Sequence, residues 1–275
     1  MRGVGAPRAI EPGCGAEPHV SLDGSQGWDE YAPFYDWENA RTVARRDVAF
    51  WRRLASAQTG PVIELGCGTG RIMLPLVRAG VRVIGVDLSL PMLARARQRL
   101  RRARLTSAAL VRGDIRSLPF RRRKGCRLVM APYGILQSLT RERDLTATLT
   151  SVADLLPGGG LLAMDLVPDL PRWDEYQRRT SLSGRHGRGG TLTLVESVRQ
   201  DFARRLTIFD HEYVRRHGSK RDVHRFSLTF RTLSVPQMQR RLEHAGFKIE
   251  ATHGDYLGGP WQESSDVWII IARKQ

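Results

Sequence analysis

The chain has 275 residues, of which 41% are hydrophobic and 26% are charged, so it is long enough to bury one large core as a single domain with additions. No apolar run approaches the roughly 20 residues that a membrane-spanning helix needs, and residues 1–27 hold no apolar segment of the secretory type. The three cysteines, Cys14, Cys67 and Cys126, lack metal-ligand spacing. These features argue against a membrane protein and a metal site, and predict a reduced, cytoplasmic protein.

The charge balance is strongly basic. The net charge of +16 comes from 44 basic and 28 acidic residues, and only four of the basic residues are lysines. Such an excess fits either a polyanionic partner such as RNA or a solvated basic surface. The arginines are spread over most of the chain, which favours the solvated surface.

The first two thirds of the chain alternate between strand and helix patterns. After a glycine- and proline-rich tail come the aromatic residues 28–37 and a predicted helix over 39–56. Strands are predicted over 61–65, 81–86, 108–111, 127–131 and 161–166, and helices over 71–79, 91–102 and 143–156. This alternation predicts an α/β, Rossmann-like fold: a mostly parallel seven-stranded sheet with helices on both faces.

From residue 167 the pattern changes. A short helix is predicted over 168–179, followed by three β-rich stretches over 191–199, 204–215 and 222–232. They indicate a small antiparallel β insertion after the fifth strand. The core pattern then resumes with a helix over 234–245, with Ser234 as its N-cap, and ends with strands over 247–252 and 267–272.

A glycine-rich segment, residues 64–70, follows the first strand and opens a helix. Its glycines let the backbone turn tightly and approach a ligand closely. The spacing is Gly-x-Gly-x-Gly, and Arg71 stands where a dinucleotide fingerprint needs its third glycine. Glu64 precedes the first glycine by two residues, and an acidic group suits a cationic ligand better than a pyrophosphate.

Two carboxylates follow the next strands. Asp87 closes the second strand, where it can accept both hydroxyls of a ribose. Asp114 follows the third strand, where it can accept from an adenine amino group while Ile115 covers the ring; the alternative is that Asp114 only caps a turn. Open α/β sheets bind ligands at these strand ends.

Taken in order, these motifs resemble those of the class I S-adenosylmethionine (SAM)-dependent methyltransferases, most closely the branch that acts on small molecules. The resemblance covers residues 28–166 well, and residues 62–93 are its most specific part. It implies SAM as the cofactor and S-adenosylhomocysteine as the product. It also implies a division into a flexible tail, a SAM-binding core with an N-terminal lid helix, a β-rich insertion and a return to the core, at residues 1–27, 28–166, 167–233 and 234–275.

The resemblance assigns cofactor contacts residue by residue. It implies that three glycines line the methionine portion: Gly66, Gly68 and Gly70. Asp87 would hold the ribose, with Leu88 and Met92 against the ribose or the adenine, and Asp114 and Ile115 at the adenine. Glu64 is also a predicted cofactor contact. Tyr31 and Tyr35 resemble lid tyrosines, although they could equally pack the first helix onto the sheet, and Arg71 resembles an arginine that often follows the glycine motif.

The methyl acceptor is less constrained, because transfer from a sulfonium mainly needs positioning and desolvation, with a base only where the acceptor loses a proton. Alternation places His211 with Phe209 on one strand face and His224 with Phe226 on another. With Tyr133, after the fourth strand, these histidines are the predicted catalytic residues. The alternative is that both histidines are core or dimer contacts.

Three functions remain open from the sequence. The favoured one is methylation of a small molecule at N, O or C. The second is an RNA or protein methyltransferase that uses the basic surface. Enzymes that methylate base amino groups commonly carry Asn/Asp-Pro-Pro-Tyr/Phe after the fourth strand, but this chain has alanine at residue 131, where the Asn or Asp would accept from the base. A nucleic-acid partner is therefore disfavoured. The third is a non-catalytic SAM-binding protein. The insertion is expected to cover the substrate or to form a homodimer contact.

Overall fold

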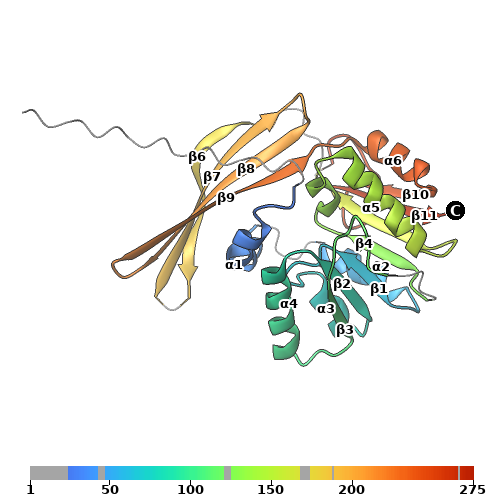
Figure 1. Ribbon diagram of the computed structural model, residues 1–275, viewed down its shortest axis with the longest axis horizontal. Helices are drawn as coiled ribbons and strands as arrows, with labels where there is room; N and C mark the ends of the chain where they lie inside the picture. The colour runs from blue at the N-terminus through green and yellow to red at the C-terminus, as the bar shows by residue number, and fades with distance from the viewer. Residues whose placement is uncertain (1–23, 43–46, 121–124, 168–173, 188, 266) are drawn as a thin grey trace, which may run out of the picture.

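The computed structural model describes residues 24–42, 47–120, 125–167, 174–187, 189–265 and 267–275. Its larger sheet has seven strands in the order β10-β11-β5-β4-β1-β2-β3 (Figure 1). These strands are β1 Val62–Leu65, β2 Val83–Asp87, β3 Ala108–Arg112, β4 Leu128–Ala131, β5 Leu161–Leu166, β10 Phe247–His253 and β11 Trp268–Lys274. The first five pair in parallel, and β11 runs antiparallel to both of its neighbours.

Helices cover both faces of this sheet. They are α2 Val48–Ser56, α3 Met73–Arg78, α4 Leu90–Arg102, α5 Glu142–Leu155 and α6 Val235–His244, with the 3-10 turn η1 Ile135–Ser138 after β4. Successive residues of β1 enter different cores: Ile63 packs with α5 and α6, whereas Val62 packs with α2 and α3. A strand buried on both faces is expected to be continuously apolar rather than alternating, as β1 largely is. The predicted Rossmann-like fold is confirmed.

The insertion after β5 is a separate antiparallel sheet. Its four strands, in the order β6-β7-β8-β9, are β6 Tyr176–His186, β7 Gly190–Asp201, β8 Leu206–His217 and β9 Lys220–Arg231. The sequence predicted three strands, and it predicted a helix over 168–179. That helix is wrong over residues 174–179, while residues 168–173 lie outside the described residues. The strand β6 lies at the edge of the sheet and is largely polar, so it shows no clear apolar alternation.

The first helix begins earlier than predicted. Helix α1 spans Trp28–Asn39, and residues 40–42 form a turn, so the helix predicted over 39–56 is wrong there and is confirmed over α2, Val48–Ser56. Tyr31, Phe34 and Tyr35 follow helical i, i+3, i+4 spacing, so the aromatic residues themselves form the apolar face of α1. This face packs on the inserted sheet, and α1 lies between that sheet and the core (Figure 1). None of the described helices has the length and apolar character needed to cross a membrane.

Candidate functional site

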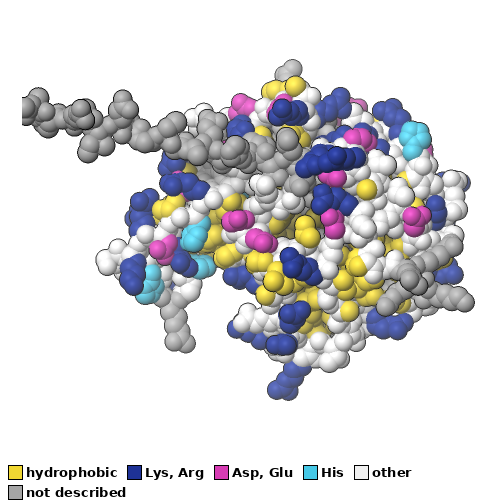
Figure 2. All heavy atoms as spheres, in the orientation of Figure 1, with side chains coloured by type: hydrophobic (Ala, Val, Ile, Leu, Met, Phe, Trp, Pro, Cys, Tyr) yellow, Lys and Arg dark blue, Asp and Glu magenta, His cyan; other side chains and the backbone are white. Residues whose placement is uncertain are grey.

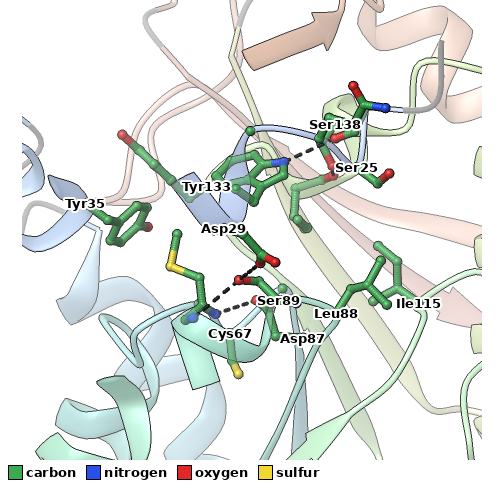
Figure 3. A pocket seen from close by; sticks show the side chains of 18 of the residues that line it. Ser25, Asp29, Tyr35, Cys67, Asp87, Leu88, Ser89, Ile115, Tyr133 and Ser138 are labelled. Carbon is green, nitrogen blue, oxygen red and sulfur yellow. Dashed lines mark hydrogen bonds between the residues drawn. The ribbon is translucent and has the colours of Figure 1, made fainter. Parts of the chain in front are cut away.

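One pocket of about 600 Å³ lies where β1 to β4 end, between α1 and strand β9 (Figure 3). Eleven of the fifteen predicted site residues line it. They are Tyr35, Glu64, Gly66, Gly68, Arg71, Asp87, Leu88, Met92, Asp114, Ile115 and Tyr133. Tyr31, Gly70, His211 and His224 are not part of this lining. Parallel strands that end at one edge therefore bring together residues that lie 50 to 100 positions apart.

Asp87 is fixed at the end of β2 by two backbone amides. Its Oδ2 accepts from the Gly68 N–H at 2.7 Å, and its Oδ1 accepts from the Ser89 N–H at 2.8 Å. Burial raises the pKa of Asp87 above its ordinary value, and these two hydrogen bonds limit the rise. Each oxygen keeps acceptor capacity, so the carboxylate can take two further O–H donors.

Glu64 lies at the floor of the pocket with a side chain that is short of partners. It is 2% exposed, and within the described structure its buried Oε2 has no hydrogen-bond donor. Burial raises the pKa of Glu64 to about 8, although the nearby Arg71 lowers it in part. A buried acceptor without a donor is costly, so the position is suited to a ligand that brings a donor or a positive charge.

Arg71 is held from two sides. Its guanidinium donates to both oxygens of Asp47, at 2.8 and 2.6 Å. The guanidinium also lies 4.8 Å from the ring centre of Tyr133, which is a cation–π distance. The pocket therefore contains an arginine whose charge is already balanced by a buried acid.

Tyr133 stands in a strained turn after β4. Its φ of 62° is in the left-handed region, which a residue with a Cβ seldom adopts. The next amide, Gly134 N–H, donates to Asp165 at 3.0 Å, and Asp165 also accepts from the Tyr256 hydroxyl at 2.7 Å. Burial raises the pKa of Asp165 to about 6, and those two hydrogen bonds oppose the rise. The sequence analysis missed this support, which joins β5 and the loop after β10 to the turn.

Asp114 is engaged by a neighbour. Arg116 donates to both of its oxygens, with N–O distances between 2.6 and 2.9 Å. The carboxylate lies in the pocket wall beside Ile115, as a contact to adenine requires, and the Arg116 N–H also donates to it at 2.9 Å. Contact with adenine remains a prediction for both residues.

The three glycines of the turn, Gly66, Gly68 and Gly70, differ in their surroundings. Gly66 and Gly68 line the pocket, and a Cβ on Gly68 would have no protein atom closer than 4.0 Å. A Cβ on Gly70 would lie 2.5 Å from the Leu74 Cδ1. All three have positive φ values, which glycine tolerates. Gly70 is thus needed where the turn packs on α3, outside the pocket lining.

Two further pocket residues were missed by the sequence analysis. Asp29, in the first turn of α1, accepts from the Ser89 hydroxyl at 2.5 Å, and both residues line the pocket. A sequence signal existed for Ser89, since a serine two residues before Pro91 is typical of a helix N-cap. Asp29 carried no such signal, because only folding brings α1 to the end of β2.

Both predicted histidines contact aromatic residues of α1, but they differ in burial. His211 is 5% exposed, its Nε2 lies 2.9 Å from Glu196 Oε2, and its ring contacts that of Tyr31. The ring of His224 lies 5.2 Å from that of Phe34. Neither histidine belongs to the pocket lining: His211 is buried among aromatic rings, whereas His224 is exposed on strand β9.

Comparison with known proteins identifies relatives of this architecture. Residues 62–160 match the family model described as a methyltransferase domain. The cypemycin N-terminal methyltransferase of a Streptomyces species is 26% identical over 219 residues, which cover 78% of this chain and 83% of that protein. The matched domain contains the glycine turn, Asp87, Asp114 and Tyr133, while α1 and the insertion lie outside it.

Solved structures share the whole fold. The CcbJ methyltransferase from Streptomyces caelestis has a TM-score of 0.73 at 21% identity, over 92% of this chain and 99% of that one. A sugar N-methyltransferase from Streptoalloteichus sp. has a TM-score of 0.72 at 16% identity, over 98% and 100% of the two chains. At these identities the likeness is one of fold, and it extends over the inserted sheet.

Proposed function

We propose that the chain is a class I SAM-dependent methyltransferase, which transfers the methyl group of SAM to a nitrogen, oxygen or carbon atom of a small molecule. The observation that carries this proposal is a pocket of about 600 Å³ that contains both the residues suited to SAM and a further wall from α1 and β9. Pockets of roughly 300–1,000 Å³ are typical of small-molecule sites.

The residues present fit the parts of SAM. Glu64 offers a buried carboxylate without a donor to the ammonium group, and Asp87 offers two fixed oxygens to the ribose hydroxyls. Leu88, Met92 and Ile115 provide apolar surface for the adenine. When bound, SAM supplies a methyl group activated by its sulfonium. The chain's own part is to orient the two reactants and to exclude water.

The acceptor is proposed to occupy the remaining wall. Tyr133, from the turn after β4, lines the pocket together with Trp28 of α1 and Phe226 of β9. Tyr133 is the proposed catalytic residue there, because it lines the pocket and remains 38% exposed. The relatives support a small molecule: one is named for methylation of cypemycin and another for methylation of a sugar nitrogen.

The basic surface supports an RNA or protein substrate less well. Figure 2 shows lysine and arginine side chains spread over the visible face, with acidic groups between them, rather than gathered in one stripe. Binding through phosphates would show a steep loss of affinity with salt, so weak and shallow salt dependence is expected with RNA. The cytoplasmic location expected from the sequence remains a proposal. A homodimer contact through the insertion remains a proposal, as do the four ranges of the predicted domain division.

Calorimetry and turnover test the proposal together. The protein should bind SAM and S-adenosylhomocysteine, and Asp87→Ala should weaken binding at least about tenfold, the effect of one set of charge-assisted hydrogen bonds. Asp154→Asn, an exposed carboxylate on α5, is the control. A panel of small amines, alcohols and activated carbon acids should then include a methylated product. Binding of SAM without any turnover would favour the non-catalytic alternative.

A further inference from the structure

A second carboxylate faces the same end of the pocket as Asp87. Asp29 comes from the first turn of α1, and its Oδ1 accepts from the Ser89 Oγ at 2.5 Å. The Ser89 backbone N–H donates to Asp87 Oδ1 at 2.8 Å. One serine therefore links two acids that are 58 positions apart in sequence, and all three line the pocket (Figure 3).

The N-terminus of helix α4 stabilises the two neighbouring carboxylates. Ser89 is its N-cap, and the serine Oγ accepts from the Met92 N–H at 3.3 Å while it donates to Asp29. Peptide dipoles make a helix N-terminus positive, which offsets part of the repulsion between the two carboxylates. Burial and, to a smaller degree, the charge of Asp29 raise the pKa of Asp87, as expected for two neighbouring acids.

Both acids retain unused acceptor capacity toward the pocket. The hydrogen bonds described for them come from neutral donors, namely the Ser89 hydroxyl and the backbone amides of Gly68 and Ser89. An ionised carboxylate has about four acceptor positions. A ligand with two adjacent O–H donors would satisfy these oxygens better than a ligand with one.

We propose that Asp29 and Asp87 hold the ribose of SAM together, so that the lid helix α1 contributes directly to the cofactor site. The inference rests on the proposed function, which places the ribose at Asp87. A vicinal diol presents two hydroxyls at a fixed spacing, so Asp29 can accept from one of the two hydroxyls that Asp87 would otherwise hold alone. Because α1 also packs on the inserted sheet through its aromatic face, cofactor binding would hold α1 between the two sheets.

A second contact ties α1 to the cofactor turn. Asp36, two turns after Asp29, accepts from the Thr69 hydroxyl at 2.6 Å and from Arg99 at 2.9 Å. Thr69 belongs to the glycine turn that forms the floor of the pocket. The helix is thus already docked along its length, and Asp29 is positioned before the cofactor arrives, which reduces the ordering cost of binding.

Calorimetry with S-adenosylhomocysteine and its 2′-deoxy and 3′-deoxy analogues tests this inference. We expect Asp29→Ala to weaken S-adenosylhomocysteine binding about tenfold, the worth of one charge-assisted hydrogen bond. We also expect the variant to lose most of the discrimination that the unmodified protein shows against one of the two deoxy analogues. Asp29 is exposed, so the variant should fold, and circular dichroism checks this.

The outcomes separate the inference from the proposed function. If Asp29→Ala binds S-adenosylhomocysteine as tightly as the Asp154→Asn control does, the inference is overturned while the methyltransferase function stands. It is also overturned if Asp29→Ala weakens all three ligands by the same factor, since Asp29 would then only position the helix. If the unmodified protein binds neither SAM nor S-adenosylhomocysteine, the proposed function and the inference fail together.

Discussion

Arg71 and Asp47 form a buried ion pair in which two nitrogens meet two oxygens, at 2.8 and 2.6 Å. The Asp47 side chain is fully buried and that of Arg71 is 11% exposed. Asp47 immediately precedes α2, whereas Arg71 follows the glycine turn, so the pair fixes the turn to a helix outside it. The orientation of Arg71 against Tyr133 depends on this acid.

Removing Asp47 should therefore destabilise the protein and disturb the pocket. Asp47→Ala leaves the guanidinium buried without its counter-charge, which typically costs about 3–5 kcal/mol. Urea unfolding measures this loss. The matched control is Asp222→Ala, because Asp222 pairs with Arg215 at 2.9 Å on the exposed part of the insertion, where such pairs contribute about 0–1 kcal/mol. Equal losses in the two variants would contradict the assignment.

The raised pKa of Glu64 predicts that the stability of the folded protein depends on pH. Burial raises its pKa from an ordinary value near 4.5 to about 8 in the folded chain. Between these values the folded state keeps a proton that the unfolded state releases, so the contribution of Glu64 to stability falls as pH rises from about 4.5 to 8. Glu64→Gln should thus gain stability relative to the unmodified protein across that range. Parallel profiles for the two proteins would show that the pKa is not raised.

The raised pKa of Glu64 also predicts that the protein releases a proton when it binds the cofactor. A cationic ammonium beside Glu64 favours its ionised form, so SAM should displace a proton from the folded protein at pH 7. Calorimetry in two buffers of different ionisation enthalpy measures the number of protons released. Glu64→Gln should remove the release and weaken binding. A release that persists unchanged in the variant would place its origin at another group.

The sequence identified the parts of the site that lie within one strand-turn-helix unit, and it missed the parts made by distant segments. The positions of Glu64, Gly68 and Asp87 followed from their places at strand ends, and they line one pocket. Asp29 and Asp165 could not be found this way, since their partners Ser89 and Gly134 lie in other elements. The four-stranded insertion was undercounted for a related reason: an edge strand with polar residues on both faces has no apolar periodicity to detect.

Substitutions at two glycines of the turn should separate the loss of cofactor binding from the loss of packing. Gly70→Ala should lower stability, because its Cβ would lie 2.5 Å from Leu74 and its φ of 79° disfavours a side chain. Gly68→Val also strains the backbone, at a φ of 51°, but its Cβ would have no protein atom closer than 4.0 Å; its side chain projects in the cofactor turn, so it should abolish SAM binding in a chain that still folds. Thermal unfolding and calorimetry on both variants check the contrast. SAM binding by Gly68→Val at normal affinity would contradict it, and so would binding of NAD.

Two roles can be distinguished for His211: a structural role in the insertion and a role as general base. Its Nε2 contacts Glu196, which also accepts from Tyr176 and Ser181. Burial would raise the pKa of Glu196, but the hydrogen bonds from His211 and Tyr176 outweigh burial and lower it. A carboxyl whose pKa is depressed contributes stability above its unfolded pKa and loses it as pH falls through the folded value. The His211–Glu196 pair thus has a structural role in the insertion that does not require catalysis.

We expect His211→Ala to make the protein unfold at a higher pH during acid titration, because Glu196 loses a donor that lowers its pKa. If His211 were also a general base, turnover with the true acceptor would fall by roughly 10² to 10⁴. Because its ring lies in the aromatic cluster and outside the pocket lining, we expect a smaller fall, at unchanged SAM affinity. His224→Ala is the matched control, since His224 also contacts α1 but has no described acid partner. A loss of several hundredfold in His211→Ala alone, in protein that remains folded, would restore the catalytic role that the sequence predicted.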